Sequence, residues 1–124
     1  MAIPILKQGD VLIASLQSAP TDQDLVQLRD ELAERIGRLR SRGVVIDVSA
    51  LDVMDSFATR TLRGIAQATR LRGADTVIVG IQPDVAFAMV QLGLTLDGIT
   101  TALDLDEGCA RLRLRANDEA ARDS

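Results

Sequence analysis

The residues best suited to chemistry are three aspartates and a serine in the middle of the chain. Asp47, Asp52 and Asp55 lie near the end of an apolar run, and Ser56 follows directly. Clustered carboxylates could bind magnesium or accept a phosphoryl group. Aspartates at the ends of strands and in short loops also cap turns. We favour turn capping, because the only lysine that could accompany a phosphoryl-accepting aspartate, as in receiver domains, is Lys7, far from the last predicted strand.

Ser56 is predicted to stand in the first turn of a helix, after a short loop. A side chain there is exposed and lies among backbone N–H groups that have no partner within the helix, at the positive end of the helix dipole. Such a position accommodates a phosphate, and a phosphate would change the surface charge abruptly. Ser56 is therefore a candidate phosphorylation site, and a simple helix cap is the alternative interpretation.

Composition excludes most catalytic and metal-binding arrangements. The chain has no histidine and one cysteine, so a histidine base, a Cys/His metal cage and an internal disulfide are all excluded. Gly64 and Gly73 are not spaced as in a phosphate-binding loop. Cys109 falls on an apolar helical stripe, which predicts a buried, inert thiol. We expect no catalytic residue, no metal and no cofactor, and we expect that the protein is not an enzyme.

Length and charge further limit the kind of protein. The chain has 124 residues, the length of one domain, and its net charge of −4 argues against binding to nucleic acid or to anionic membranes. It shows neither a secretory leader pattern nor an apolar run of membrane-spanning length. These observations predict a cytoplasmic protein.

The hydrophobic pattern predicts one α/β domain over residues 1–116, followed by a frayed polar tail over 117–124. The expected order is β-β-α-β-α-β-α-β-α. Strands are expected over 3–7, 11–16, 44–48, 76–80 and 99–102, and helices over about 21–42, 56–72, 83–92 and 104–116.

Particular residues are expected to begin and end these elements. Thr21 should cap the first helix together with Asp24, and Gly43 should end that helix as a left-handed cap. Pro83 suits the first turn of the third helix, and Asp104 should cap the last. The inward face of the third helix is expected to consist of Val85, Ala88, Met89 and Leu92.

The strands are expected to form a mixed, mostly parallel sheet with an antiparallel hairpin at its N-terminal edge. The strands over 44–48 and 76–80 do not alternate in polarity, which is typical of strands buried on both faces of a parallel sheet. In such sheets the loops after the strands gather on one rim, where sites usually form. Residues 49–55 and 81–84 both fall on that rim.

Nearly the whole chain, from Ile3 to about Leu114, resembles a STAS domain, the fold of bacterial anti-anti-sigma factors. Within that family it is most similar to the single-domain RsbS-type proteins of the stressosome, which act in the stress response by partner switching. The matching stretches are Ile3–Lys7, Gly43–Asp47, Met54–Phe57, Gly80–Pro83, Leu92–Gly93 and Thr101–Leu105.

The resemblance implies that Ser56 is phosphorylated by an RsbT-type serine/threonine switch kinase. The unmodified protein would bind that kinase and the phosphoprotein would release it, while an RsbX-type phosphatase restores the serine. The resemblance also implies assembly with RsbR-type STAS paralogues in a stressosome and self-association as a homodimer. Residues 80–94 contain no serine or threonine, so a second site of the kind that some relatives carry there is not expected. The partner-binding residues predicted on this basis are Asp55, Ser56, Phe57, Arg60, Gln82 and Pro83.

Two alternatives remain open at this stage. One is an anti-anti-sigma factor that binds an anti-sigma kinase directly, outside any stressosome. The other is a structural or ligand-binding STAS module that is never phosphorylated, in which Ser56 only caps a helix.

Overall fold

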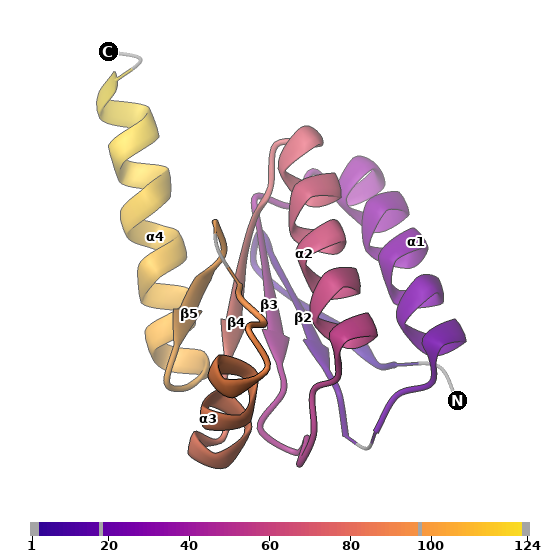
Figure 1. The fold of residues 1–124 in the computed structure, drawn as a ribbon. Helices are drawn as coiled ribbons and strands as arrows, with labels where there is room; N and C mark the ends of the chain where they lie inside the picture. The colour runs from indigo at the N-terminus through magenta and orange to yellow at the C-terminus, as the bar shows by residue number, and fades with distance from the viewer. Residues whose placement is uncertain (1–2, 18, 97, 123–124) are drawn as a thin grey trace.

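The protein is a five-stranded sheet with helices on both faces (Figure 1). The computed structural model describes residues 3–17, 19–96 and 98–122, with side chains through residue 113. The strands lie in the order β1-β2-β3-β4-β5; β1 and β2 are antiparallel and all other neighbours are parallel, which confirms the predicted mixed sheet. The strands are β1 (Ile5–Gln8), β2 (Val11–Ser15), β3 (Gly43–Asp47), β4 (Asp75–Val79) and β5 (Thr100–Ala102), and the helices are α1 (Asp22–Leu39), α2 (Ser56–Leu71), α3 (Pro83–Gln91) and α4 (Leu105–Arg122).

Alternate side chains of the central strands belong to two separate apolar clusters. In β3, Val44 and Ile46 pack in the cluster that α1 and α2 share, whereas Val45 packs in the cluster beneath α4. All three are fully buried, as expected for a strand covered on both faces. Figure 1 shows α1 and α2 side by side on one face of the sheet and α4 on the other.

Helix α1 begins as predicted but ends differently. Thr21 Oγ1 accepts a hydrogen bond from the Asp24 N–H at 3.1 Å, and Asp24 Oδ2 accepts one from the Thr21 N–H at 3.0 Å. The left-handed residue at the other end is Arg40, with φ of 53°, so the prediction that Gly43 caps the helix is wrong. Gly43 begins β3 instead, where a Cβ would lie 2.8 Å from Leu112 Cδ1 of α4.

Two predictions of burial were also wrong. Within α3 only Val85 and Met89 are buried, while Ala88 and the following Leu92 are exposed. Pro83 does occupy the first turn of that helix. Cys109 is partly rather than fully buried, at the edge of the cluster beneath α4.

Helix α4 begins as predicted, because Asp104 Oδ1 accepts a hydrogen bond from the Glu107 N–H at 2.9 Å. Its backbone continues to Arg122, past the expected end near residue 116. The division into a domain over 1–116 and a polar tail stays a prediction. Among the described residues, no helix is long and apolar enough to cross a bilayer.

Candidate functional site

The candidate site lies at the carboxyl ends of the parallel strands, as the sequence predicted. Ser15, Asp47 and Val79 are register partners at the ends of β2, β3 and β4, so the loops that follow start at one level. The loop over 49–55 leads from β3 to α2, and the loop over 80–82 leads from β4 to α3. We call the surface formed by these two loops and the first turns of α2 and α3 the rim.

The two rim loops are held tightly against each other. Gly80 has φ of 81°, and a Cβ on it would lie 2.8 Å from Ser49 Cβ and 3.2 Å from the Ser49 backbone nitrogen. Only glycine combines this conformation with so close an approach. The Gln82 side chain adds a hydrogen bond from Nε2 to the Ser49 carbonyl oxygen at 2.8 Å. The loops therefore behave as one structural unit.

Ser56 is the first residue of α2, and its side chain is exposed. The cap of this helix is Asp55, whose Oδ1 accepts a hydrogen bond from the Ala58 N–H at 2.7 Å. Among the described residues, the Ser56 hydroxyl makes no hydrogen bond, so the interpretation of Ser56 as the cap is wrong. The capping role belongs to its neighbour, and the serine hydroxyl is left facing solvent.

The other aspartates of the cluster do not converge on a common point. Asp47 Oδ1 accepts a hydrogen bond from the Ser49 N–H at 2.9 Å, which is the turn-capping role favoured from the sequence. Asp52 is exposed in the loop. In the part of the chain that the structure describes, no three acidic or cysteine side chains are grouped so as to hold a metal ion.

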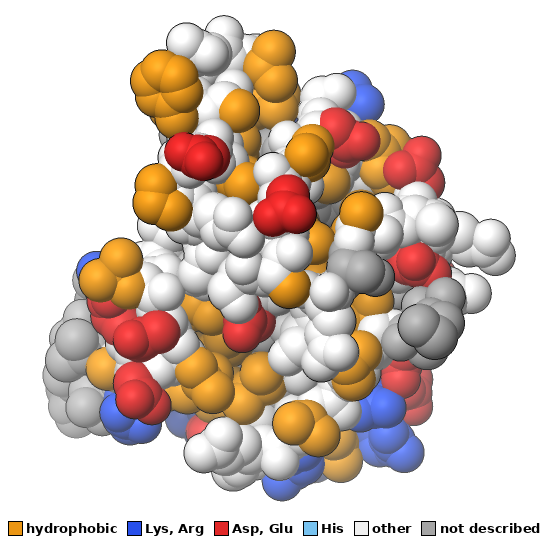
Figure 2. All heavy atoms as spheres, turned by 90° about the horizontal axis from the view of Figure 1, so that it is seen from below, with side chains coloured by type: hydrophobic (Ala, Val, Ile, Leu, Met, Phe, Trp, Pro, Cys, Tyr) orange, Lys and Arg blue, Asp and Glu red, His pale blue; other side chains and the backbone are white. Residues whose placement is uncertain are grey.

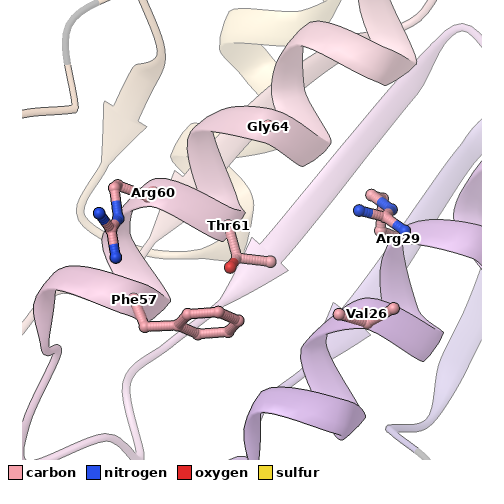
Figure 3. A pocket seen from close by; sticks show the side chains of 6 residues that line it. All are labelled: Val26, Arg29, Phe57, Arg60, Thr61 and Gly64. Carbon is pink, nitrogen blue, oxygen red and sulfur yellow. The ribbon is translucent and has the colours of Figure 1, made fainter.

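Phe57 and Arg60 line a groove between α1 and α2, next to Ser56. The groove has a volume of about 410 Å³, and Val26 and Arg29 of α1 form its opposite wall. Figure 3 shows the Phe57 ring directed across the groove towards Val26, with Arg60 lying back over the first turn of α2. The sequence predicted Phe57 and Arg60 as partner-binding residues but missed Val26 and Arg29. Because Val26 and Arg29 are three residues apart, the sequence indicates that they share one face of a helix. That this face borders the groove follows only from the packing of α1 on α2.

The rim as a whole combines exposed hydrophobic and acidic side chains. Figure 2 shows this face, with acidic and hydrophobic side chains interspersed over it and basic ones at its margins. The hydrophobic residue that stands out most in the loop before α2 is Val53, which is 72% exposed. Asp52, Asp55 and Asp84 are exposed on the same rim. A surface of this composition is suited to a protein partner, because exposed hydrophobic patches commonly mark interaction sites.

Comparison with known proteins places the chain in a family. Residues 2–108 match the family model described as the STAS domain. The structure is similar to an RsbS variant of Moorella thermoacetica in which one serine is replaced by glutamate, with a TM-score of 0.79 and 38% identity, covering 93% of this chain and 97% of that one. A protein in a solved structure of the stressosome, described as a signal integration and transduction hub, is 39% identical, with a TM-score of 0.75 over 91% of this chain and 98% of that one.

Among curated proteins, the chain is similar to the RsbT co-antagonist protein RsbRA of Bacillus subtilis strain 168. The two are 29% identical over 82 residues, which is 66% of this chain. The match covers 30% of the length of RsbRA, so this chain corresponds to one portion of that longer relative. The family match covers most of the chain and the sheet order agrees with that of the similar structures, which shows that this chain belongs to the STAS domain family.

Proposed function

We propose that the protein is a phosphorylation-switched binding module that sequesters a serine/threonine switch kinase until Ser56 is phosphorylated. The observation that carries the proposal is the free, exposed Ser56 hydroxyl on the rim, beside an aspartate that already caps the helix. A kinase active site can reach this oxygen without any unfolding of the domain. The protein acts by binding rather than by catalysis, and we expect it to do so in the cytoplasm.

The domain itself accommodates a phosphate at Ser56. Phosphorylation adds roughly −1.5 to −2 charges at neutral pH. The N-terminus of a helix stabilises an anion by about 0.3–1 kcal/mol at an exposed position. Modification therefore leaves the fold intact and changes only the surface that a partner meets.

A kinase bound to the unmodified rim meets a neutral hydroxyl next to the Asp55 carboxylate. The phosphate would have to be desolvated beside that carboxylate, and an unmatched charge buried in an interface costs several kcal/mol. A cost of that size weakens binding by a factor of tens to thousands. The loss at the interface exceeds the gain at the helix end, so the modified protein releases its partner.

The relatives support a wider assembly. The match to a protein of the stressosome and the similarity to RsbRA favour assembly with RsbR-type STAS paralogues. We infer that an RsbT-type kinase phosphorylates the serine and that an RsbX-type phosphatase restores it. The kinase-binding surface in this proposal consists of Asp55, Ser56, Phe57, Arg60, Gln82 and Pro83.

Calorimetric titration with an RsbT-type kinase tests the switch. Ser56→Ala should bind the kinase at least as tightly as the wild type, and Ser56→Asp should bind tens-fold more weakly while keeping the same unfolding midpoint. Gln67→Asp is the matched control, because Gln67 is exposed on the same helix but away from its first turn. It adds the same charge and should bind normally.

Three results would contradict parts of the proposal. Equal affinity of the Ser56→Ala and Ser56→Asp proteins for the kinase would contradict an electrostatic switch at Ser56. Incubation with kinase and ATP that left Ser56 unmodified, as read by mass spectrometry, would support the alternative of a STAS module that is not phosphorylated. Recovery of an anti-sigma kinase without any paralogue in a pull-down would favour direct anti-sigma binding.

A further inference from the structure

Both rim loops lie in stretches of the chain that contain no positive charge. Residues 43–59 and residues 73–110 contain no lysine or arginine. The charged side chains that these two stretches contribute to the rim are all acidic. Arg60 follows the first stretch directly, so it is the basic residue nearest to Ser56 in the sequence. A phosphate on Ser56 would therefore have acidic neighbours on the rim and Arg60 as its nearest basic neighbour along the chain.

Arg60 stands one turn after Ser56 on helix α2. Residues four apart lie on the same face of a helix, and an acidic group placed four residues before a basic one is the favourable order. Long side chains on helices also lean back towards the N-terminus. Figure 3 shows the Arg60 side chain lying back over the first turn of α2 in this way, away from Val26 and Arg29. It is placed to reach a phosphate on Ser56 without any change of the backbone.

The Arg60 guanidinium has no other partner among the described residues. It is exposed, and it forms no ion pair or hydrogen bond with that part of the chain. The neighbouring arginines differ in this respect. Arg63, on the next turn of α2, donates a hydrogen bond from Nη1 to the Thr95 carbonyl oxygen at 3.4 Å. Arg29 on α1 forms an ion pair with Asp30 at 3.2 Å. A new anion at the start of α2 can therefore bind Arg60 without breaking an existing contact.

We propose that Arg60 binds the phosphate of phosphorylated Ser56 within the same molecule. The inference rests on the proposed function, which supplies the phosphate. A guanidinium binds phosphate through two parallel N–H···O hydrogen bonds, a geometry that lysine cannot reproduce. Arg60 is also the one positively charged residue of the proposed kinase-binding surface. Phosphorylation therefore changes that surface twice, because it adds negative charge at Ser56 and occupies the arginine that the kinase would otherwise contact.

A measurement on the protein alone tests the contact. Phosphoserine is incorporated at position 56 during translation, by genetic encoding, so that no kinase is needed. Its second pKa, ordinarily about 6, is read from the phosphorus NMR chemical shift as a function of pH. A neighbouring guanidinium lowers this pKa because it favours the dianion. Arg60→Gln should raise the pKa by about 0.5, as expected for the loss of one charge at about 4 Å in water with partial screening by salt.

Two variants serve as controls. Arg60→Lys keeps the charge but loses the paired hydrogen bonds, so its pKa should lie between those of the wild type and Arg60→Gln. Arg63→Gln removes the same charge from the same face of α2, one turn further from the phosphate, and should raise the pKa by less than about 0.2. The carboxylates of the rim, on Asp52, Asp55 and Asp84, are the same in every variant, so their opposite effect on the pKa cancels.

Two results would overturn the inference. One is an equal pKa in the wild type and in Arg60→Gln. The other is a change in Arg63→Gln as large as that in Arg60→Gln, because the phosphate would then respond to the overall charge of α2 rather than to a contact. Circular dichroism and the unfolding midpoint show that every variant is folded.

Calorimetric titration with an RsbT-type kinase separates a failure of this inference from a failure of the proposed function. The ratio between the affinities of the unmodified and the phosphorylated protein should be about twofold to fivefold smaller in Arg60→Gln than in the wild type, the value of one exposed ion pair. An unchanged ratio would overturn the loss of Arg60 as a kinase contact. A lowered pKa in a phosphoprotein that still binds the kinase would contradict the proposed function and leave the contact in place. Normal release, together with a pKa that does not depend on Arg60, would do the reverse.

Discussion

The close approach of Gly80 to Ser49 gives a quantitative test of how the rim is held together. Replacing Gly80 by alanine has two costs. The first is the left-handed backbone conformation, with φ of 81°, which costs a residue with a Cβ about 1–2 kcal/mol. The second is the contact of the new Cβ with Ser49 Cβ at 2.8 Å and with the Ser49 Cα at 3.2 Å. Overpacking of that kind costs about 1–3 kcal/mol. Gly80→Ala should therefore lower the free energy of unfolding by about 2–5 kcal/mol.

Gly73→Ala is the matched control. Gly73 has φ of 87°, but a Cβ on it would meet no other atom within 4 Å. This variant carries only the conformational cost, about 1–2 kcal/mol. Urea unfolding gives both values by linear extrapolation, provided that the dependence on denaturant is unchanged. The difference between the two variants is the energy of the contact between the loops.

The double variant Gly80→Ala with Ser49→Gly separates the side-chain contact from the backbone contact. Removing the Ser49 Cβ relieves the 2.8 Å approach but leaves the backbone atoms at 3.2 Å. Part of the lost stability should return, measured as a coupling energy between neighbouring sites. Equal destabilisation by Gly80→Ala and Gly73→Ala, with no coupling to Ser49, would refute the view that the two rim loops are packed against each other.

Two further predictions concern the starts of helices α2 and α1. Asp55→Ala should lower the free energy of unfolding by about 1 kcal/mol through loss of the helix cap, whereas Ser56→Ala should change it by less than about 0.5 kcal/mol. Urea unfolding measures both values. A larger loss for Ser56→Ala than for Asp55→Ala would mean that Ser56 is the cap. The hydrogen bond from the Thr21 N–H lowers the pKa of Asp24 below its ordinary value. Because the pKa is lower in the folded state, this carboxylate stabilises the fold above the unfolded pKa, near 4, and the contribution is lost as pH falls through the folded pKa. The Asp24→Asn protein should therefore lose less stability than the wild type between about pH 5 and pH 2. Thermal unfolding midpoints measured across this range test the prediction. The same pH dependence in both proteins would contradict the assignment.

The elements whose signals are local could be predicted from the sequence. The Thr21 capping box needs only residues three apart, and the structure contains it. The non-alternating run in β3 predicted burial on both faces because a parallel central strand has no solvated side. The position of the rim could be predicted from the parallel topology, because the carboxyl ends of neighbouring parallel strands lie at the same edge of the sheet.

The features that were missed depend on contacts between distant segments. Gly43 is glycine because Leu112, far along the chain, packs where its side chain would lie, and a helix cap was the only local explanation available. Helix α3 is apolar on most sides, so no periodic pattern distinguishes the buried Val85 and Met89 from the exposed Ala88. The groove beside Ser56 exists because two helices pack side by side, and the spacing of Val26 and Arg29 on one helix does not by itself indicate which helix they face.

The exposure of the rim has a consequence for how such proteins can diversify. Most of its exposed residues, such as Val53 and Asp84, contribute little to the two apolar clusters that hold the fold. Substitutions at surface positions of this kind usually change stability by less than about 0.5 kcal/mol. Duplicated copies of the domain can therefore acquire different binding preferences by mutation of exposed rim residues alone. The contact between Gly80 and Ser49 meanwhile keeps the conformation of the rim loops unchanged.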